Sequence, residues 1–295
     1  MKKDFAMLGA MLIAGMSLPA FAAEPWNDPQ VNEVNRAPMH TSYFAYESAK
    51  KAGQGKEASA NFVSLDGKWH FKWVRDRQER PVDFWKKGYD VSGWELIDVP
   101  GNWELLGYGD PMYLNYGYPW RGIMESNPPT VPDKNNHIGS YRRTIKVPAN
   151  WKGKDVIAHF GSATSNIQLW VNGRYVGYGE DSKLENEFDI TRYIIPGQEN
   201  DIAVQMDRWC DGTYLEDQDF FRFSGLAREN YLYARNKNRV EDLRVQGDLT
   251  NNYTDGKLTV SAKVKGSGNL TIDLIDADGK TIASDVADNA KGNVV

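Results

Sequence analysis

The segment 211–222 holds the densest group of residues that could do chemistry. Asp211, Glu216, Asp217 and Asp219 place four acidic side chains within nine positions, and aromatic residues border them. Carboxylates this close together repel one another unless a cation or a hydrogen-bonding ligand offsets their charge. The spacing is compatible with a site for a hard cation and sugar hydroxyls, and equally with a solvated acidic loop.

Two other segments carry groups of the same kind. An acidic turn at 180–181 follows a hairpin signal at 172–173 and could add oxygen ligands, although alone such a turn is typical of a surface loop. Pro128 and Pro129 stiffen the chain after Asn127 and keep that residue out of the helical region. An asparagine amide both donates and accepts hydrogen bonds, which suits recognition of a polyol, and the alternative is a plain turn between strands. Nearby aromatic residues could stack on a sugar or belong to the core: Tyr113, Tyr116, Tyr118 and Trp120.

Other kinds of site are excluded. The single cysteine, Cys210, rules out an internal disulfide and a cysteine-based zinc site, and we interpret it as a small buried residue. The four histidines lack the paired spacing of a zinc motif, and no nucleophile elbow, P-loop or dinucleotide fingerprint occurs. The formal charge of −5 gives no electrostatic footprint for nucleic acid or anionic lipid. A glycosidase pair among Glu216, Asp217 and Asp219 is conceivable, but these acids lie on one short segment, whereas such enzymes normally bring their two carboxyl groups from separate elements.

Alternating apolar residues predict that these groups stand on a framework of strands. Trp69, Phe71 and Trp73 fall on one face of the segment 68–73. The dipeptide at 172–173, Asn-Gly, predicts a two-residue hairpin, because a type I′ turn needs positive φ at both central residues. Many short strands with glycine and proline turns predict an all-β chain that contains a jelly-roll β-sandwich. Further strands are expected at 141–147, 167–171, 174–178, 202–206 and 231–233, with one short helical turn at 83–87.

The chain divides into three predicted parts. Residues 1–22 have a basic start, an apolar run and a small-residue cleavage site, which indicates an export signal removed before Ala23; a membrane anchor is the alternative. Residues 23–236 form the expected jelly-roll domain. Residues 237–295 predict an immunoglobulin-like sandwich, which we expect to be incomplete because such a domain needs about 100 residues. Its predicted elements are strands at 240–245, 258–264 and 270–275, with a hairpin turn at Asp278-Gly279.

Further motifs stand out along the chain: WNDP at 26–29, VNR at 34–36, VPGNWE at 99–104, SNPP at 126–129, LWVNG at 169–173, GYGEDS at 177–182 and DGTYLEDQDFFRFSG at 211–225. Together they resemble the bacterial β-galactosidases of glycoside hydrolase family 2. The resemblance runs over nearly the whole chain after the predicted signal. The LEDQD segment with the aromatic residues, Arg and Ser-Gly that follow it separates β-galactosidases from the glucuronidases and mannosidases of that family, whereas the hairpin motif does not.

The resemblance implies roles for five residues. Asn127 is expected to contact galactose hydroxyls, and Asp219 to bind the sugar and to ligate a sodium ion, Na+. Asp211 resembles a ligand of a structural magnesium ion, Mg2+, with Glu180 and Asp28 beside it. Glu180 falls where the family often has Gln, and Asp28 where a neutral Asn can stand. This acidic pair could therefore tighten the cation or change which cation is held.

The resemblance also implies what the chain does. The family's retaining chemistry lies in a (β/α)8 barrel that follows the immunoglobulin-like domain, so we assign no catalytic residue within these 295 residues. We expect the amino-terminal part of an exported, periplasmic or extracellular β-galactosidase, which orients a β-galactoside and is inactive alone. The family implies a homo-oligomer at full length, and we expect no membrane contact after signal cleavage. The alternatives are a stand-alone carbohydrate-binding module or lectin, and a family member specific for glucuronides or mannosides.

Overall fold

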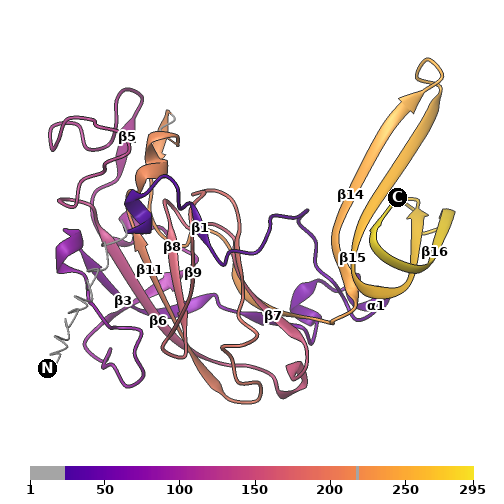
Figure 1. Cartoon of the computed structure of the whole chain (residues 1–295), viewed down its shortest axis with the longest axis horizontal. Helices are drawn as coiled ribbons and strands as arrows, with labels where there is room; N and C mark the ends of the chain where they lie inside the picture. Colours follow the sequence, from indigo (N-terminus) through magenta and orange to yellow (C-terminus); the bar gives the residue numbers. More distant parts are fainter. Residues whose placement is uncertain (1–23, 217–218) are drawn as a thin grey trace, which may run out of the picture.

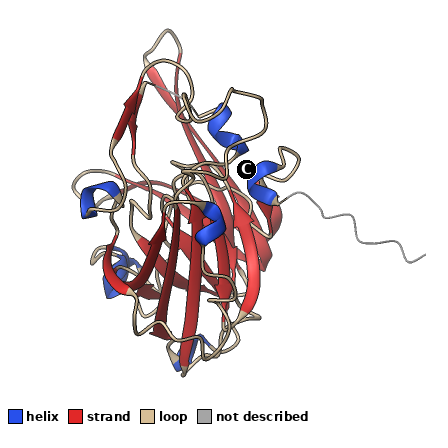
Figure 2. Cartoon of the chain, turned by 90° about the vertical axis from the view of Figure 1, so that its left-hand side faces the viewer, coloured by secondary structure: helices blue, strands red, loops and turns tan. Residues whose placement is uncertain are grey.

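The computed structural model describes residues 24–216 and 219–295, and in this part the chain is built of antiparallel strands with a few short helical turns (Figures 1 and 2). The expectation of an all-β chain is confirmed. The export signal expected at residues 1–22 lies outside the described residues. Within the described ranges, no helix has the length and apolar character needed to cross a bilayer.

Two sheets form the larger β-sandwich. The first has seven strands in the order β1-β9-β8-β11-β6-β3-β4, and the second has four in the order β10-β7-β13-β2. In the first sheet the strands are β1 (Glu33–Val34), β3 (Gly67–Val74), β4 (Glu95–Val99), β6 (Ile138–Lys146), β8 (Ile167–Val171), β9 (Arg174–Gly179) and β11 (Glu199–Asp207). In the second they are β2 (Phe62–Ser64), β7 (Asp155–Phe160), β10 (Asn186–Asp189) and β13 (Asn230–Arg235).

The core of the sandwich lies between these two sheets. Trp69 and Phe71 on β3 are fully buried in it, as the alternation of that strand predicts, and Trp73 packs against it partly exposed. On β7, Val156, Ala158 and Phe160 face the core, so the residues between them face outward. The outer face of the four-stranded sheet therefore carries a separate aromatic cluster of Ile157, Tyr231 and Tyr233, with Phe44 and Phe62 packed on it.

The hairpin between β8 and β9 forms as predicted. Val171 pairs with Arg174, which leaves Asn172 and Gly173 as the two turn residues, with φ of 52° and 76°. The amide of Asn172 donates hydrogen bonds to the carbonyl of Tyr193 and to Asn200 Oδ1, both at 2.8 Å. The pairing shifts by one residue between Leu169 and Trp170 and ends with Gly179 opposite Ile167, directly before Glu180.

Helices are short. The helical turn expected at 83–87 is wrong: Asp83 has a φ of +62°, which a right-handed helix does not allow, and the segment forms turns and bends instead. The described residues hold one α-helix, α1 (Ala49–Ala52), and six 3-10 turns. These turns are η1 (Pro25–Asn27), η2 (Lys56–Ala58), η3 (Arg77–Glu79), η4 (Glu104–Leu106), η5 (Ala149–Trp151) and η6 (Asp211–Tyr214).

A small two-stranded sheet carries the acidic segment at one end of the sandwich. Strand β12 (Phe220–Arg222) pairs with β5 (Met112–Leu114), so that Phe220 lies opposite Leu114 and Arg222 opposite Met112. Figure 1 shows β5 and this pair at the end of the sandwich away from the carboxyl-terminal strands. The pairing brings segments about one hundred residues apart in sequence to the same end of the molecule.

The carboxyl-terminal residues form a three-stranded antiparallel sheet of long hairpins, β14 (Arg239–Thr250), β15 (Asp255–Ile275) and β16 (Thr281–Val294). The two strands expected at 258–264 and 270–275 are parts of one strand, β15, which is irregular between Val264 and Leu270. The predicted turn at 278–279 is present, with Gly279 at φ +82°. Most side chains of this sheet are exposed, and its buried residues are Ala262 and Ala290. The polar run at 236–239 joins it to β13.

Candidate functional site

Glu180 and Asp211 meet at the centre of the acidic region. Glu180 directly follows β9, and Asp211 opens η6, so the hairpin register and the 3-10 turn position them. Ligand atoms of Glu180, Asp211 and Cys210 all lie within 4.8 Å of one another. Both residues are buried: the exposed fraction is 8% for Glu180 and 6% for Asp211. Glu180 Oε1 accepts a hydrogen bond of 2.6 Å from the hydroxyl of Tyr178.

Two buried carboxyl groups in contact cannot both be ionised without a compensating charge. Burial, with the nearby charges of Asp211 and Glu216, raises the pKa of Glu180 to about 8. Burial also raises the pKa of Asp211, and the charge of Asp28 adds to this effect. A bound divalent cation would supply this compensating charge, and both carboxyl groups offer the oxygen ligands that a hard cation prefers.

Asp28 lies in the amino-terminal segment, and its charge acts on Asp211. It ends η1, and its carboxylate Oδ1 accepts a hydrogen bond of 3.1 Å from the backbone of Gln30. Among the described residues, the ligand atoms that lie together belong to Glu180, Cys210 and Asp211, and Asp28 is not part of this group. The role of Glu180, Asp211 and Asp28 as magnesium ligands stays a prediction.

Cys210 is the fully buried residue that we expected, and it forms the back of the cluster. Its Sγ donates a long hydrogen bond of 3.6 Å to the carbonyl of Ser165. Burial raises the pKa of the thiol, with the charge of Glu180 adding to it, so the sulfur is neutral at ordinary pH. A hard cation prefers oxygen, and a protonated thiol is not one of its ligands.

The Asn127 loop is fastened to η6. The backbone N–H of Asn127 donates to the hydroxyl of Tyr214 at 3.1 Å, and that hydroxyl donates to the carbonyl of Thr130 at 2.7 Å. Asn127 is exposed, and its side-chain amide has no hydrogen bond to another described residue. The loop therefore offers a free amide at a fixed position, next to the turn that begins with Asp211.

Asp219 lies just before β12 and is exposed. Its Oδ1 accepts a hydrogen bond from the hydroxyl of Tyr113 on β5. This bond raises the pKa of Tyr113 and keeps its hydroxyl protonated. The second oxygen of the carboxylate remains available to a ligand at the surface.

The aromatic residues near these loops have two different roles. Trp120 is fully buried, and Tyr118 stacks on it with ring centroids 5.5 Å apart, so these two belong to a core that also contains Trp209. Tyr113 and Tyr116 are 51% and 75% exposed. Of the four aromatic residues considered from the sequence, these two are available to a sugar.

A cavity of about 180 Å³ beside the acidic segment was not predicted from the sequence. Glu216 lines it and accepts a hydrogen bond of 3.0 Å from the backbone of Ser182. Arg208 and Trp209 also line it, and Arg208 Nε and Trp209 Nε1 are buried without a hydrogen-bond partner among the described residues. The elements that meet here are separate in sequence, and spacing along the chain carries no signal of the cavity.

Comparison with known proteins gives three findings. Residues 62–236 match the family described as "Glycosyl hydrolases family 2, sugar binding domain". A β-galactosidase of Priestia megaterium (strain DSM 319 / IMG 1521) is 39% identical over 248 residues, which are 83% of this chain and 24% of that protein. A β-galactosidase of Lactobacillus delbrueckii subsp. bulgaricus is 37% identical over 259 residues, 87% of this chain and 25% of that protein. The chain thus spans about a quarter of the length of these relatives.

Solved structures share the fold. Bacteroides uniformis beta-glucuronidase 2 has a TM-score of 0.62 at 19% identity, covering 79% of this chain and 26% of that chain. Ruminococcus gnavus beta-glucuronidase has a TM-score of 0.57 at 18% identity, covering 79% of this chain and 38% of that chain. At these identities the likeness shows the fold alone.

Proposed function

The chain belongs to glycoside hydrolase family 2, and from this premise we propose that it is the amino-terminal part of a retaining β-galactosidase that acts on terminal non-reducing β-galactose residues. In this proposal, the described residues bind and orient the sugar and hold structural cations. The carboxyl groups that break the glycosidic bond come from outside the chain. The proposed setting is periplasmic or extracellular, with a homo-oligomer as the assembled enzyme.

The placement of Asn127 and Asp219 carries the proposal. Both side chains are exposed at the same end of the sandwich, and each is positioned by a tyrosine, Tyr214 for the Asn127 loop and Tyr113 for Asp219. A free amide and a carboxylate on preorganised loops can donate to and accept from vicinal hydroxyls. Because these contacts hold the Asn127 backbone and one oxygen of Asp219 in place, less entropy is lost when a sugar binds.

The two proposed cations have separate places. Asp211, Glu180 and Asp28 would hold Mg2+, whose charge, when the ion is bound, offsets the repulsion of the buried carboxyl groups and ties η1, β9 and η6 together. Asp219 would hold Na+ through its free oxygen, together with groups of the substrate. Their contribution is positioning and orientation, worth about 1.5–3 kcal/mol for each hydrogen bond to a charged group.

The buried pair of Glu180 and Asp211 is unsuited to the hydrolysis itself. A retaining pair sits about 5–5.5 Å apart on either side of the bond that it cleaves. Glu180 and Asp211 are both buried, and neither lines the cavity beside them. A sugar cannot enter between them, which supports the assignment of catalysis to groups elsewhere.

The proposal is tested with the purified chain and three chromogenic substrates, a β-galactoside, a β-glucuronide and a β-mannoside. We expect no turnover of any of them, and binding of methyl β-galactoside that is lost when Asn127 or Asp219 is replaced by Ala. Galactoside hydrolysis that copurifies with the chain through two different chromatographic steps would overturn the assignment of catalysis.

The binding measurement also separates the alternative functions. Tighter binding of the glucuronide than of the galactoside would favour a glucuronidase, the class of the solved structures above. Galactose binding as tight as that of lectins, with micromolar dissociation constants, would favour a stand-alone binding module. Neither outcome is expected for a domain that lends two exposed groups to a larger site.

A further inference from the structure

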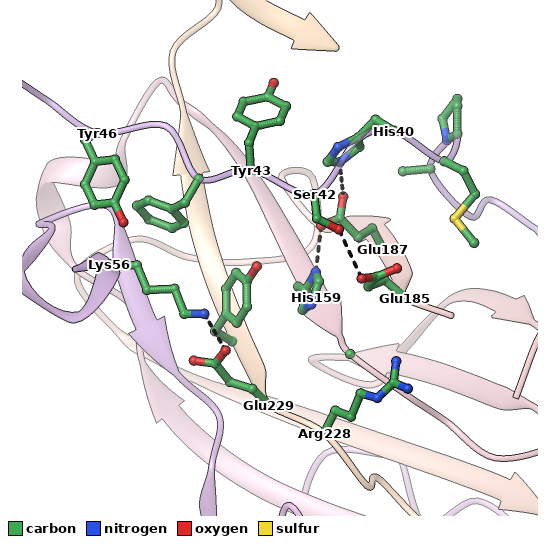
Figure 3. Close-up of a pocket in the computed structure, with 16 residues that line it drawn as sticks. His40, Ser42, Tyr43, Tyr46, Lys56, His159, Glu185, Glu187, Arg228 and Glu229 are labelled. Atoms are coloured by element: carbon green, nitrogen blue, oxygen red, sulfur yellow. Dashed lines mark hydrogen bonds and ion pairs between the residues drawn. The ribbon is translucent and has the colours of Figure 1, made fainter. Parts of the chain in front are cut away.

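A larger cavity, of about 470 Å³, lies on the outer face of the four-stranded sheet (Figure 3). The segment 37–46 runs across this face and forms one wall, and residues of β10, β7 and β13 form the floor. The cavity shares no lining residue with the smaller cavity beside the acidic segment. It also contains none of the residues predicted from the sequence to bind the sugar or a cation.

A histidine–carboxylate–histidine bridge holds the wall to the floor. Glu187 on β10 contacts His40 Nε2 through Oε2 at 2.9 Å and His159 Nδ1 on β7 through Oε1 at 2.8 Å. The hydroxyl of Tyr233 donates to the same Oε2 at 2.9 Å. Figure 3 shows both imidazoles directed at this carboxylate.

Further contacts fix the segment 37–46 in place. The backbone N–H of Ala37 donates to the carbonyl of Glu187 at 2.7 Å, and the hydroxyl of Tyr43 donates to the carbonyl of Val240 at 2.7 Å. The backbone N–H of Thr41 donates to Asp242 Oδ1 at 3.0 Å. The wall is therefore ordered before a ligand arrives, which lowers the entropic cost of binding.

Aromatic rings form one side of the cavity. Phe44 lies 4.9 Å from Tyr46 and 6.4 Å from Tyr231 between ring centroids. Tyr231 is held flat by His159, whose ring stacks on it at 4.3 Å with an angle of 18° between the planes. Tyr231 is itself buried and Lys56 lies over its ring, so the half-buried rings of Phe44 and Tyr46 give the apolar surface for the C–H face of a ring-shaped ligand.

Charged groups also line the cavity, and their charges nearly balance. Glu185, Glu187 and Glu229 carry negative charge, and Lys56 and Arg228 carry positive charge. Lys56 forms an ion pair with Glu229, as Figure 3 shows. The three carboxylates would repel an anionic ligand, and Lys56 and Arg228 would repel a bare cation. A neutral ligand rich in hydroxyl groups meets donors and acceptors with no net charge against it.

Glu185 and Arg228 have hydrogen-bonding capacity to spare. Glu185 Oε1 accepts one long hydrogen bond of 3.3 Å from the hydroxyl of Ser42. Arg228 donates one nitrogen, Nη1, to the carbonyl of Lys183 at 2.6 Å. A carboxylate and a guanidinium on one wall can bind adjacent hydroxyls of a sugar, one as acceptor and one as donor.

We propose that this cavity is a second carbohydrate-binding site, which takes one or two neutral pyranose units of an oligosaccharide. The sugar ring packs against Phe44 and Tyr46, and its hydroxyls bond to Glu185 and Arg228. The site lies apart from Asn127 and Asp219, so it concerns binding of a longer glycan and does not depend on the function proposed above.

The test is a titration of the chain by isothermal calorimetry and by NMR, with lactose, cellobiose, methyl β-galactoside and glucuronic acid as probes. Glu185→Gln and Tyr46→Ala remove a hydrogen-bond acceptor and an aromatic face. Glu199→Gln is the matched control, because Glu199 is an exposed residue of β11 away from the cavity. We expect binding of at least one neutral disaccharide that weakens about tenfold in each cavity variant and is unchanged in the control.

Asp219→Ala separates this site from the one proposed above. A disaccharide affinity that survives Asp219→Ala but falls in Glu185→Gln and Tyr46→Ala supports the second site, even if the first one fails its own test. Three results would overturn it: no binding of any neutral probe at tens of millimolar sugar, binding that depends on Asp219 alone, or glucuronic acid bound as tightly as the neutral sugars. Near-ultraviolet circular dichroism of each variant shows whether its fold is intact, and the wild-type titration decides the matter if a variant unfolds.

Discussion

Asp155, the first residue of β7, accepts a hydrogen bond of 2.6 Å at Oδ2 from Nη1 of Arg239, the first residue of β14. Lys237 and Lys265 also donate to this carboxylate. Burial works against the charge of Asp155, but the hydrogen bonds from these three cations outweigh it and hold its pKa well below the usual range. One buried carboxylate thus links the sandwich to the carboxyl-terminal sheet.

Replacing Asp155 by Asn should loosen this link. The change removes the negative charge that three cations share and costs about 1–3 kcal/mol. We expect faster limited proteolysis near residues 236–240, followed by loss of the carboxyl-terminal sheet, while the sandwich persists. Mass spectrometry of the fragments locates the cleavage.

Asp98→Asn is the control for this experiment. Asp98 forms an ion pair with Lys68 in which both side chains are about 60% exposed, so its loss should have little effect. Equal cleavage rates in the wild type and Asp155→Asn would show that the link does not hold the two parts together.

Magnesium should stabilise the chain through the Glu180–Asp211 cluster. Adding MgCl2 to chelator-treated protein at pH 8 is expected to raise the thermal midpoint, because a ligand that binds the native state alone stabilises it by mass action. Asp211→Ala should abolish this rise. Glu180→Gln keeps one oxygen ligand and should weaken Mg2+ binding about tenfold, as measured by differential scanning calorimetry against MgCl2 concentration. A rise that is the same in Asp211→Ala would place the cation elsewhere.

Asn127→Ala and Asp219→Ala should reduce sugar affinity without reducing stability. Each removes about 1–2 kcal/mol of hydrogen bonding to the sugar, which is a five- to thirtyfold loss of affinity for methyl β-galactoside. Because both residues are exposed, the free energy of unfolding should change by less than about 0.5 kcal/mol. NMR titration gives the affinity, and urea unfolding gives the stability. Affinity unchanged in both variants would remove these residues from the site.

The histidine–carboxylate bridge predicts a pH dependence. Burial opposes the charge of Glu187, but hydrogen bonds from His159 and His40 outweigh it and lower its pKa to about 2. The ionised Glu187 carboxylate therefore stabilises the folded chain above its unfolded pKa of about 4.3, and this stabilisation is lost as the pH falls toward 2. The hydrogen bond to Glu187 raises the pKa of His40, so that contribution is complete below about pH 6.5 and is lost as the pH rises past the raised value.

The pH dependences of Glu187 and His40 together define a pH window in which their contact stabilises the folded chain most. The stability difference between wild type and Glu187→Gln should be largest near pH 5.5, at about 1–3 kcal/mol, and smaller at pH 3 and at pH 8.5. Thermal midpoints at the three pH values measure it, at roughly 2–4 °C for each kcal/mol. A difference that does not vary with pH would mean that Glu187 acts through packing and not through its charge.

Much of the sandwich could be predicted because its signals are local. The alternation of Trp69 and Phe71 with polar residues gave the buried face of β3, and the dipeptide at 172–173 gave the hairpin turn. The helical turn at 83–87 failed because a positive φ at Asp83 depends on tertiary packing that composition does not encode. The single strand β15 was divided because its irregular stretch near Gly266 resembles a turn in sequence.

The candidate sites also contain some residues that motifs predict and others that only folding brings together. Glu180 and Asp211 were found through motifs, and the structure supplies what sequence cannot, their burial and mutual contact. His40 and Glu187 are 147 residues apart, and only the folded chain brings them together. The spacing of histidines along a chain can reveal a metal motif, but a carboxylate that bridges two histidines leaves no such pattern.

Gly139 on β6 should be a sensitive position of the sandwich core. A Cβ at this position would lie 2.2 Å from Cζ2 of Trp103 and 2.9 Å from Cε2 of Phe71, both fully buried rings. Neither ring can move away, since each packs on the other with centroids 6.0 Å apart in a filled core. Gly139→Ala should therefore destabilise the chain by about 1–3 kcal/mol in urea unfolding, while Gly247→Ala, whose Cβ meets no atom within 4 Å, should change it little. Equal stability of the two variants would show that the core around Trp103 is loosely packed.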